Sequence, residues 1–514
     1  MSWWRGAVLY HIYVRSFADS DGDGVGDLRG LIGKLDRLAW LGVDALWLSP
    51  VGRSPNDDWG YDVCSYDEVD PELGRNADLE ELIREAASRG LKVMLDLVPN
   101  HTSDRHPWFT DPERRDWYVW ADPAPGGGPP NNWLSIFGGS AWELDEASGR
   151  YYLHNFLPSM PDLNWWNPEV RAEFEAILQR WFEVGVAGIR IDVAHGLVHD
   201  RELRDNPPAG PKDGETLRRI GQFPKYSLNR PEVLDIYRAW RTLADGYDPP
   251  RLLLGETYVV DLGRLAEFYG GDGLDLGMNF ALVHADLDEL PQVVAETEAR
   301  LPAAAWPVLL GSSHDHVRFP TRWAGGDEAL ARCALVALLT LRGTPILYQG
   351  DELLLEQVEV PRERLRDPVG VSGWPAQQGR DGSRTPMPWE PGEGYGFTRP
   401  GVEAWLPFGE HDGRTWAEQR DDPGSALNLA HELLALRRRE RDLREGAYQQ
   451  LDAPDDVWAY RRGERIAVAL NLGSDPVALT FGGDVLLATG ADFDGTLAGR
   501  SGVVLALDEH TFDG

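Results

Sequence analysis

Residues 188–196 read Gly-Ile-Arg-Ile-Asp-Val-Ala-His-Gly, and the interpretation of the whole chain starts from this stretch. It begins as a short β-branched run, the pattern of a buried strand in a parallel sheet. Arg190, Asp192 and His195 interrupt that pattern with polar side chains. Because Arg190 and Asp192 are two residues apart, a strand turns both to one face, which a closed barrel turns inward. The stretch therefore indicates either a structural ion pair inside a barrel or, at the barrel's open end, a catalytic site.

Apolar runs that resemble strands recur along the chain and alternate with helical patterns. Such alternation is typical of parallel crossover units, and eight strands are what a closed barrel requires. We therefore predict an α/β fold, a (β/α)8 TIM barrel. The expected strands are residues 8–13, 45–48, 92–98, 188–193, 252–254, 274–280, 307–310 and 345–348. The expected helices are residues 31–41, 79–88, 170–184, 232–244, 329–341 and, as the last helix, 427–437.

Three segments depart from this alternation. Residues 102–161 are crowded with Trp, Pro and Gly, and an irregular insertion of this size after the third strand indicates a small domain. From about residue 447, Val, Leu and Thr alternate with Gly and Asp turns, which is typical of an antiparallel β domain. Residues 356–421, after the eighth strand, form a long insertion that we expect to act as a lid. The predicted domains are a catalytic barrel (1–101 and 162–445), an inserted subdomain (102–161) and a C-terminal β domain (446–514).

Composition narrows the class of partner and the compartment. The chain has 514 residues, of which 84 are acidic and 50 are Lys or Arg, so its net charge is −34. The electric field of so negative a protein repels nucleic acid and anionic membranes, so we expect neither as a partner. Cys64 and Cys333 are the only cysteines, which implies no disulfide framework and fits a reducing cytoplasm. We see no export signal and no run long enough to span a bilayer, so export is not expected.

An acidic loop, Asp19-Ser-Asp-Gly-Asp-Gly-Val-Gly-Asp27, follows the first expected strand. Its acids and its central glycine match the first nine positions of an EF-hand loop, but Gly30 occupies the twelfth position and no helix precedes it, so it is no EF-hand. We expect one hard cation there, Ca²⁺ rather than Mg²⁺, because a wrapped all-protein cage suits the larger ion. The alternative is a solvated acidic loop without an ion. The expected ligands are the carboxylates of Asp19, Asp21, Asp23 and Asp27 and the carbonyl of Val25. No organic cofactor is indicated.

Polar side chains follow four of the expected strands. In a barrel these strand ends meet on one rim, where barrels of this type keep their active sites. A single acid at such a position is more often a helix cap or an ion-pair partner, but four strands ending in this way together favour an active site. The residues are Asp96 and His101, Arg190 and Asp192, Glu256, and His314 and Asp315.

Three neighbouring carboxyl groups do not share one charge state. A set with one ionised group that attacks and one protonated group that donates its proton suits cleavage of a glycosidic bond. Asp192 is the candidate nucleophile, because Arg190 on the same face is expected to keep it ionised. Glu256 has no cation beside it in the sequence, so we expect it to hold a proton and act as the acid. Asp315, flanked by two histidines, is expected to stay charged, to hold sugar hydroxyls and to stabilise the developing positive charge.

Four motifs carry a family resemblance: Asp96–His101 (DLVPNH), Gly188–His195 (GIRIDVAH), Gly255–Tyr258 (GETY) and Ser313–Asp315 (SHD). Over nearly its whole length the chain resembles the α-amylase superfamily, glycoside hydrolase family 13, and within it the α-glucosidase and oligo-1,6-glucosidase branch. The resemblance implies a retaining, exo-acting α-glucosidase that removes terminal non-reducing glucose from short oligosaccharides. It assigns the same nucleophile, acid/base and transition-state stabiliser as the argument above.

The resemblance also implies a set of residues that hold the terminal glucose ring. They are Asp58, Tyr61, His101, Phe156, Arg190, His314 and Arg384. The acidic loop at 19–27 is similar to the calcium loop of this branch. For a retaining enzyme, the carboxyl groups of Asp192 and Glu256 are expected to lie roughly 5 to 5.5 Å apart.

Several alternatives stay open at this point. A transglucosylase, a sucrose hydrolase or an isomerase shares these motifs and differs in what reaches the covalent intermediate. A catalytically silent relative, such as the ectodomain of a transporter heavy chain, lacks the carboxylate set and carries a membrane anchor, unlike this chain. In this branch Val directly after the nucleophile, here Val193, tends to accompany α-1,6 cleavage. However, Ala194 and His195 depart from the usual pattern, so the linkage is left open.

Overall fold

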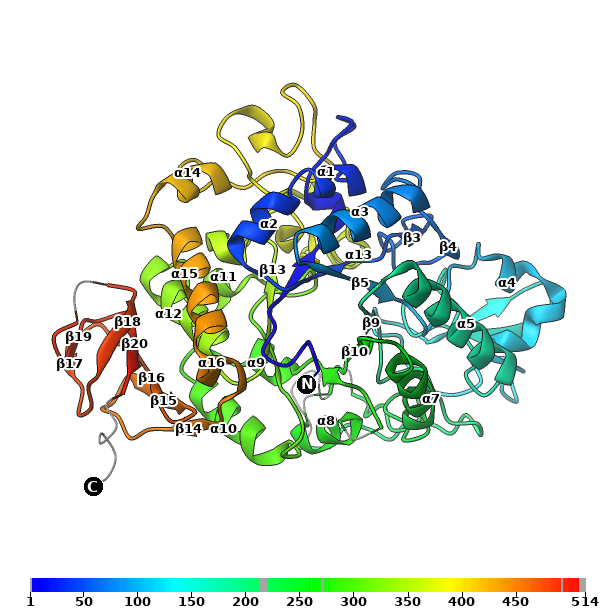
Figure 1. Ribbon diagram of the computed structural model, residues 1–514. Coiled ribbons are helices and arrows are strands. Elements are labelled where there is room, and N and C mark those ends of the chain that lie inside the picture. The colour runs from blue at the N-terminus through cyan, green and yellow to red at the C-terminus, as the bar shows by residue number, and fades with distance from the viewer. Residues whose placement is uncertain are drawn as a thin grey trace.

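The computed structural model describes residues 2–211, 218, 221–259, 261–269, 272–490 and 493–507. Its centre is an eight-stranded parallel sheet with the order β11-β10-β9-β5-β2-β1-β13-β12, a nearly closed barrel (Figure 1). The predicted TIM barrel is thereby confirmed. Its strands are β1 (Leu9–Ile12), β2 (Ala45–Leu48), β5 (Lys92–Leu97), β9 (Gly188–Ile191), β10 (Leu252–Gly255), β11 (Leu276–Gly277), β12 (Val308–Leu310) and β13 (Thr344–Tyr348).

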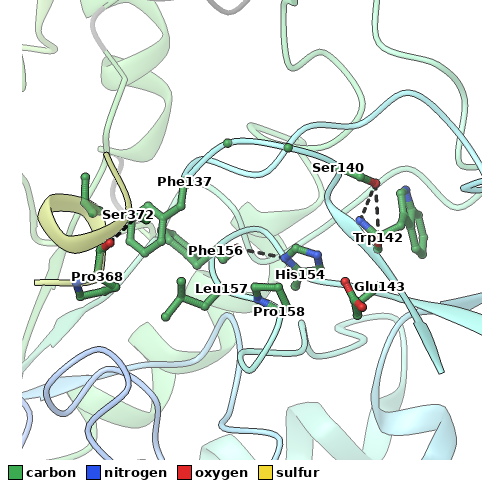
Figure 2. Close-up of a pocket in the computed structure, with 13 residues that line it drawn as sticks. Phe137, Ser140, Trp142, Glu143, His154, Phe156, Leu157, Pro158, Pro368 and Ser372 are labelled. Atoms are coloured by element: carbon green, nitrogen blue, oxygen red, sulfur yellow. Dashed lines mark hydrogen bonds between the residues drawn. The ribbon is translucent and has the colours of Figure 1, made fainter. Parts of the chain in front are cut away.

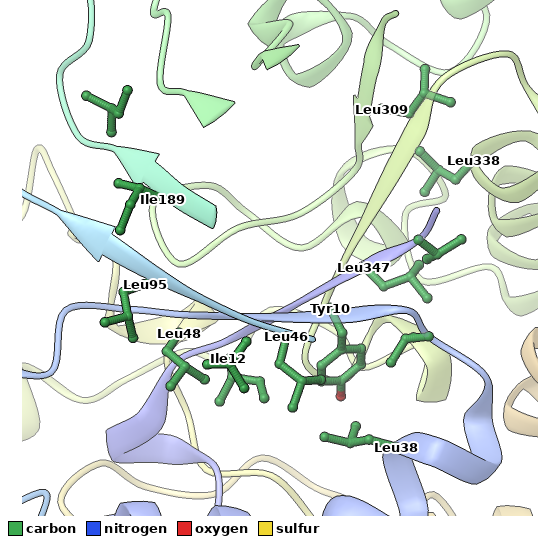
Figure 3. Close-up of a cluster of buried hydrophobic side chains, with 14 of the residues drawn as sticks. Tyr10, Ile12, Leu38, Leu46, Leu48, Leu95, Ile189, Leu309, Leu338 and Leu347 are labelled. Carbon is green, nitrogen blue, oxygen red and sulfur yellow. The ribbon is translucent and has the colours of Figure 1, made fainter. Parts of the chain in front are cut away.

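Side chains alternate between the inside of the barrel and the helices around it, as the two-residue period of a strand requires. Inside, one buried cluster joins Leu276 of β11 to Val308 and Leu310 of β12, so the interior packing is continuous across the two ends of the sheet order. On the outside, strand residues pack against helices, and complete burial of each leucine contributes about 2 kcal/mol. Figure 3 shows such outward residues, with Leu38 and Leu338 contributed by the helices α2 (Leu35–Leu41) and α12 (Glu328–Thr340).

The crossover helices follow local sequence signals, as α5 (Pro168–Val184) illustrates. The Asn167 side chain accepts from the Glu169 N–H and Pro168 occupies the first turn, both typical of a helix start. Gly185, with φ of 111°, ends the helix in the left-handed conformation that glycine adopts without strain. In the described part of the chain, no helix has both the length and the apolar character needed to cross a membrane. The other barrel helices are α1 (Leu28–Ile32), α3 (Asn76–Ser88), α7 (Val233–Asp245), α8 (Leu262–Phe268), α9 (Phe280–His284), α10 (Leu290–Arg300), α11 (Phe319–Arg322), α14 (Trp416–Asp421), α15 (Ala426–Arg439) and α16 (Arg441–Glu445).

Three expected elements differ from the structure. The single helix expected at 31–41 is two helices, α1 and α2, because the Asp27 side chain starts the first one early and the chain breaks at Gly33. The sixth strand, expected at 274–280, is shorter, since the Asn279 side chain already caps α9. The helix at 427–437 is not the last one, because α16 follows it.

The segment 102–161 contains a three-stranded antiparallel sheet with the order β6-β8-β7, in addition to the short helix α4 (Pro107–Thr110). Its strands are β6 (Trp120–Ala121), β7 (Trp142–Asp145) and β8 (Arg150–Leu153). A hairpin of β3 (Gly52–Arg53) and β4 (Ser65–Val69) occupies a stretch that the sequence presents only as a polar loop. The insertion after β13 contains α13 (Pro368–Gly373). These additions lie around the barrel at positions remote from the C-terminal sheet (Figure 1).

The C-terminal residues form the expected antiparallel β domain, a five-stranded sheet with the order β14-β15-β16-β20-β18. It packs on α12, where the Tyr460 hydroxyl lies 2.6 Å from Thr340 Oγ1 and the Arg462 guanidinium donates to the Thr340 carbonyl. Within the predicted domain 446–514, residues 491–492 and 508–514 lie outside the described part, and the exact domain boundaries stay a prediction. The strands of this sheet are β14 (Tyr448–Gln450), β15 (Val457–Arg462), β16 (Ile466–Asn471), β18 (Asp484–Ala488) and β20 (Ser501–Ala506). Two further strands, β17 (Val477–Ala478) and β19 (Thr496–Leu497), pair with each other in a separate sheet.

Candidate active site

Arg190, on the inner face of β9, is the centre of a buried cluster of acids. Its side chain is 1% exposed. One guanidinium nitrogen lies 3.0 Å from Asp96 Oδ1 and 2.6 Å from Asp192 Oδ1, and the other lies 2.8 Å from Glu256 Oε1. Because β9 pairs with β5 and β10, the carboxyl ends of three neighbouring strands bring these acids together. Arg190 and Asp192 therefore share one face, as their spacing predicts.

Backbone hydrogen bonds fix the ends of these strands. The Asp192 N–H donates to the Leu97 carbonyl at 2.9 Å, and the Glu256 N–H donates to the Ile191 carbonyl at 2.8 Å. Val193 has a φ of 45°, a strained conformation for a β-branched residue that costs on the order of 1–3 kcal/mol. In this conformation its N–H donates to Glu256 Oε2 at 2.9 Å. The strain thus serves to hold the Glu256 carboxylate beside Asp192.

The charge distribution differs from the expectation drawn from the sequence. Glu256 does have a cation beside it, since Arg190 reaches it through space. Burial and the neighbouring Glu256 carboxylate raise the pKa of Asp192 well above its ordinary value, although Arg190 opposes this shift. Arg190 thus acts on Asp192 in the expected direction, while burial and Glu256 act against it. One guanidinium therefore faces three carboxyl groups, and the ionisation of each depends on that of the others.

Asp315 lies at the end of the loop that follows β12, among cations of its own. Its Oδ1 lies 3.1 Å from Arg380 Nη1 and 3.0 Å from Arg384 Nη2, and its Oδ2 lies 3.1 Å from His314 Nε2. Burial opposes its ionisation, but His314, Arg380 and Arg384 together hold the pKa of Asp315 well below its usual range. Because burial also lowers the pKa of His314, the two arginines supply the positive charge. Asp315 is therefore ionised, in contrast to the cluster around Arg190.

The structure brings the expected ring-holding residues together with the acids around Arg190 and with Asp315. This group of residues is called the cup below. The Tyr61 hydroxyl lies 3.1 Å from Asp96 Oδ2 and 2.7 Å from His314 Nε2, and so connects the two groups of acids. Asp58, on the loop between β3 and β4, lies 2.6 Å from Arg380 Nη2. Burial raises the pKa of Asp58 to about 6, although Arg380 opposes the shift. These contacts join Asp58, Arg380, Asp315, His314, Tyr61 and Asp96 into one polar network.

His101 and Phe156 form another wall. Their rings lie 5.1 Å apart, and His101 is 1% exposed. Asn100 lies 3.1 Å from His101 Nδ1, while the buried His101 Nε2 has no hydrogen-bond partner in the described part of the chain. Burial lowers the pKa of His101 to about 4, so the ring is neutral at neutral pH. A neutral imidazole with a free nitrogen suits an uncharged hydroxyl group.

Arg380 is the residue of the site that the sequence interpretation missed. Besides Asp58 and Asp315, its guanidinium binds Asp367 at 2.6 Å and lies 5.5 Å from the centre of the Phe137 ring. Its one sequence signal was its position four residues before Arg384, on the same insertion after β13. Only the folded chain shows that this insertion reaches the hairpin loop that carries Asp58.

We expect Arg380→Lys to lower kcat/KM by about 10²-fold, because an ammonium group cannot bridge several carboxylates as a guanidinium does and each lost charged hydrogen bond is worth about 1.5–3 kcal/mol. Steady-state kinetics measures the effect. Arg362→Lys, at an exposed position on the same insertion, is the matched control and should retain full activity. Equal activity of the two variants would contradict the role given to Arg380.

The buried acids predict how stability depends on pH. Burial raises the pKa of Asp96 to about 7 against the opposing effect of Arg190, whereas an unfolded aspartate titrates near 4. Folding is therefore favoured while Asp96 is protonated, and this contribution is lost as the pH rises from about 4 to 7. We expect the Tm of the ligand-free protein to fall between pH 5 and 7, and to fall less in Asp96→Asn. Asp288→Asn, at an exposed position, should leave the slope unchanged, and an unchanged slope in Asp96→Asn would contradict the argument.

On the open side of Glu256 lies an aromatic surface that the sequence presents only as part of a motif. Tyr258 is 41% exposed, and its hydroxyl lies 2.6 Å from His284 Nε2. The His316 ring stacks on Tyr258 with centroids 6.4 Å apart. Burial lowers the pKa of His284 and lowers that of His316 to about 4, so this surface is uncharged at neutral pH. A neutral aromatic wall suits the apolar face of a sugar or of another leaving group.

The acidic loop at 19–27 lies apart from the acid cluster. Carboxylate oxygens of Asp19, Asp21 and Asp27 lie within 4.8 Å of one another, a hard-oxygen set that suits a cation such as Ca²⁺. Asp23 is outside that group, and its Oδ1 accepts from the Val25 N–H at 2.8 Å. Burial, together with Asp21 and Asp19, raises the pKa of Asp23. The three carboxylates thus fit a cation, whereas Asp23 and the Val25 carbonyl stay predicted ligands.

Comparison with known proteins identifies similar chains along nearly the whole length. Residues 11–446 match the family described as the α-amylase catalytic domain, and residues 444–504 match a domain of unknown function, DUF3459. A probable α-glucosidase of Rhizobium meliloti is 42% identical over 92% of this chain and 90% of its own length. An oligo-1,6-glucosidase of Heyndrickxia coagulans is 35% identical over 93% of each chain. The crystal structure of an α-glucosyl transfer enzyme, XgtA, superposes with a TM-score of 0.92 at 40% identity, over 99% of this chain and 100% of the other.

Proposed function

The chain belongs to the α-amylase catalytic-domain family, and from that premise we propose that it is a retaining, exo-acting α-glucosidase acting on short oligosaccharides or α-glucosides. The observation that carries the proposal is the gathering of Asp192 and Glu256 on one guanidinium, with the ionised Asp315 in the same cup. A double displacement needs two carboxyl groups roughly 5 to 5.5 Å apart, and a shared contact with Arg190 supports such a spacing.

In the proposed reaction, Asp192 attacks the anomeric carbon while the protonated Glu256 gives its proton to the departing oxygen. This forms a covalent glucosyl-Asp192 and releases the shortened sugar. Glu256 then takes a proton from water, which attacks the same carbon and restores the α configuration. Asp315, held ionised by Arg380 and Arg384, stabilises the positive charge that develops on the ring in both steps.

The ligand-free contacts imply that the Glu256 carboxyl group changes partners when substrate binds. In the absence of a sugar it accepts from Arg190 and from the Val193 N–H. We infer that the leaving-group oxygen draws Glu256 away from Arg190. Arg190 is then left to Asp96 and Asp192, which favours an ionised nucleophile.

The low exposure of the three acids supports an exo-acting enzyme, which removes one terminal glucose. The side chains of Asp192, Glu256 and Asp315 are 8%, 15% and 26% exposed. Arg380 joins Asp58 to Asp315 and so closes one side, and Phe156 closes the other against His101. We infer that a site bounded in this way accepts one terminal glucose ring and that the rest of the substrate extends past Tyr258. The uncharged aromatic surface at Tyr258, the net charge of −34 and the family together support a neutral sugar as the partner.

A product assay with maltose, isomaltose and sucrose tests this function. We expect glucose to be released from the non-reducing end, with the α anomer formed first in a time-resolved NMR spectrum. The disaccharide that reacts fastest also gives the linkage preference. Formation of the β anomer first, or cleavage only inside longer chains, would contradict a retaining exo-enzyme.

A second candidate function, transglucosylation, is favoured by the aromatic surface at Tyr258 and by the similarity to the α-glucosyl transfer enzyme. A sugar or other alcohol held against that surface competes with water for the glucosyl-Asp192 intermediate. The same disaccharides at high concentration separate the two functions, since a dominant transfer product would replace hydrolysis as the main activity. Sucrose hydrolysis and isomerisation are detected in the same product mixtures.

We propose that the loop at 19–27 holds a structural Ca²⁺ ion, with Mg²⁺ as the lesser option. The support is the group of Asp19, Asp21 and Asp27 and the contacts that this loop makes with the insertion after β13. The Asp19 N–H donates to the Phe397 carbonyl at 2.8 Å, and the Trp405 N–H donates to the Gly24 carbonyl at 2.9 Å. A bound cation would therefore stabilise the insertion that carries Arg380 and Arg384.

Removal of the cation is expected to lower the Tm of the protein, because an ion that binds only the folded state stabilises it by mass action. Differential scanning calorimetry with and without a chelator measures the shift, and added Ca²⁺ should restore it. Asp21→Asn should abolish the difference, whereas Asp67→Asn, at an exposed position outside the loop, should keep it. No shift in the wild-type protein would count against an occupied site.

We also propose that the protein resides in the cytoplasm. Cys64 is half-buried, Cys333 is buried, and both are free thiols, as a reducing compartment favours. Fractionation of the source cells tests this location.

A further inference from the structure

A cavity of about 300 Å³ lies beside the catalytic cup, between the segment 102–161 and the insertion after β13 (Figure 2). None of the catalytic acids lines it. One side is formed by the loop and strands around β7 and β8, and the other side by α13. Its lining comprises Phe137–Ser140, Trp142, Glu143, His154, Phe156–Pro158, Pro368, Val369 and Ser372.

The cavity shares a wall with the cup. Phe137 and Phe156 pack edge to face, with centroids 5.5 Å apart. Phe156 also contacts His101, and Phe137 lies under the Arg380 guanidinium. His101 and Arg380 belong to the cup. The two rings therefore line the cavity and also contact residues of the cup.

The chemistry of the lining selects a class of ligand. Phe137, Leu157 and Pro368 make one end of the cavity apolar (Figure 2). At the far end, the exposed Glu143 carboxylate is acceptor-only. His154 Nδ1 lies 2.9 Å from the Phe156 carbonyl, which can only accept, so Nδ1 donates to it and Nε2 is the ring nitrogen left for a ligand. An apolar surface with acceptors at one end fits a ligand that has an apolar face and hydroxyl donors.

We propose that this cavity is a second saccharide site, which binds one hexose ring independently of the catalytic cup. The ring lies with its apolar face on Leu157 and Pro368, and its hydroxyl groups donate to Glu143 and His154. The site does not depend on the function proposed for the cup, because its lining contains none of the three acids to which catalysis is assigned.

Calorimetric titration of the Asp192→Asn protein with maltose tests the site without turnover. We expect two binding sites, of which Ser372→Phe removes one by filling the cavity and Arg384→Ala removes the other, in the cup. In the same background Glu143→Gln should weaken the second site by about 10-fold, as for the loss of one charged hydrogen bond of about 1.5 kcal/mol. Glu146→Gln, on the exposed turn beside β7 and away from the cavity, should not weaken it.

The outcomes separate this inference from the proposed function. A single site that Arg384→Ala abolishes and Ser372→Phe leaves intact would refute the second site and leave the α-glucosidase function standing. A single site that only Ser372→Phe abolishes would support the cavity and count against the cup as a sugar pocket. The absence of binding at either place would contradict both.

Discussion

Replacement of Asp192 by Asn is expected to lower kcat on an aryl α-glucoside by ~10⁶-fold, the scale on which loss of a covalent nucleophile slows an enzyme. Asn keeps the size of the side chain but offers no carboxylate to attack the anomeric carbon. Removing one acid from a cluster that crowds three around Arg190 also relieves charge repulsion, so the variant should fold and have an undiminished Tm. Stopped-flow and steady-state assays measure the loss.

A variant with a smaller side chain at position 192 tests whether this residue is the nucleophile, and not only whether it is important. Asp192→Ala leaves space for a small anion, and azide should then attack the carbon from the side that Asp192 occupied. The expected product is β-glucosyl azide, of inverted configuration, because a single displacement has replaced two. An α-glucosyl azide, or no effect of azide in a folded variant, would contradict the assignment of Asp192.

Glu256→Gln is the second large change, and its effect should depend on the leaving group. A general acid contributes about 10²–10⁴-fold, so kcat/KM for maltose should fall by roughly that factor. A substrate with fluoride as the leaving group needs little protonation, and its first step should be far less affected. Equal losses for both substrates would contradict the role of Glu256 as the acid, and full activity would refute it outright.

Much of the barrel was predictable because its signals are local. A buried strand appears in the sequence as an apolar run. The polar residues that interrupt or end such a run, for example Asp96 and Asp192, lie where the strand reaches the rim of the barrel. Pairing of β5, β9 and β10 then follows from barrel order, so the gathering of Asp96, Asp192 and Glu256 could be expected from the sequence.

The electrostatics of the site could not be predicted in the same way. Glu256 has no cation near it in the sequence, yet Arg190 reaches it across β9 and β10. The contact between Arg380 and Asp58 joins residues more than 300 positions apart. Such charges depend on side chains that meet only in the folded chain, and each changes the protonation of its neighbours.

The misread elements have a related cause. The break between α1 and α2 depends on the Asp27 cap, a short-range signal that is easily overlooked in a loop whose acids also resemble a metal ligand set. The hairpin of β3 and β4 is too short and polar to show a strand period. The cavity in Figure 2 lies between two insertions, and nothing in either sequence alone reveals that their surfaces face each other.

The central claim is that Asp192 forms a covalent bond to glucose, and trapping that bond tests it most directly. A fluorinated glucosyl fluoride, which slows both steps but keeps a good leaving group, should accumulate as a glucosyl-enzyme. Peptide mass spectrometry is then expected to place the added sugar on the peptide containing residues 188–196, at Asp192. A label on any other carboxylate, or an active enzyme that gains no label, would contradict the account.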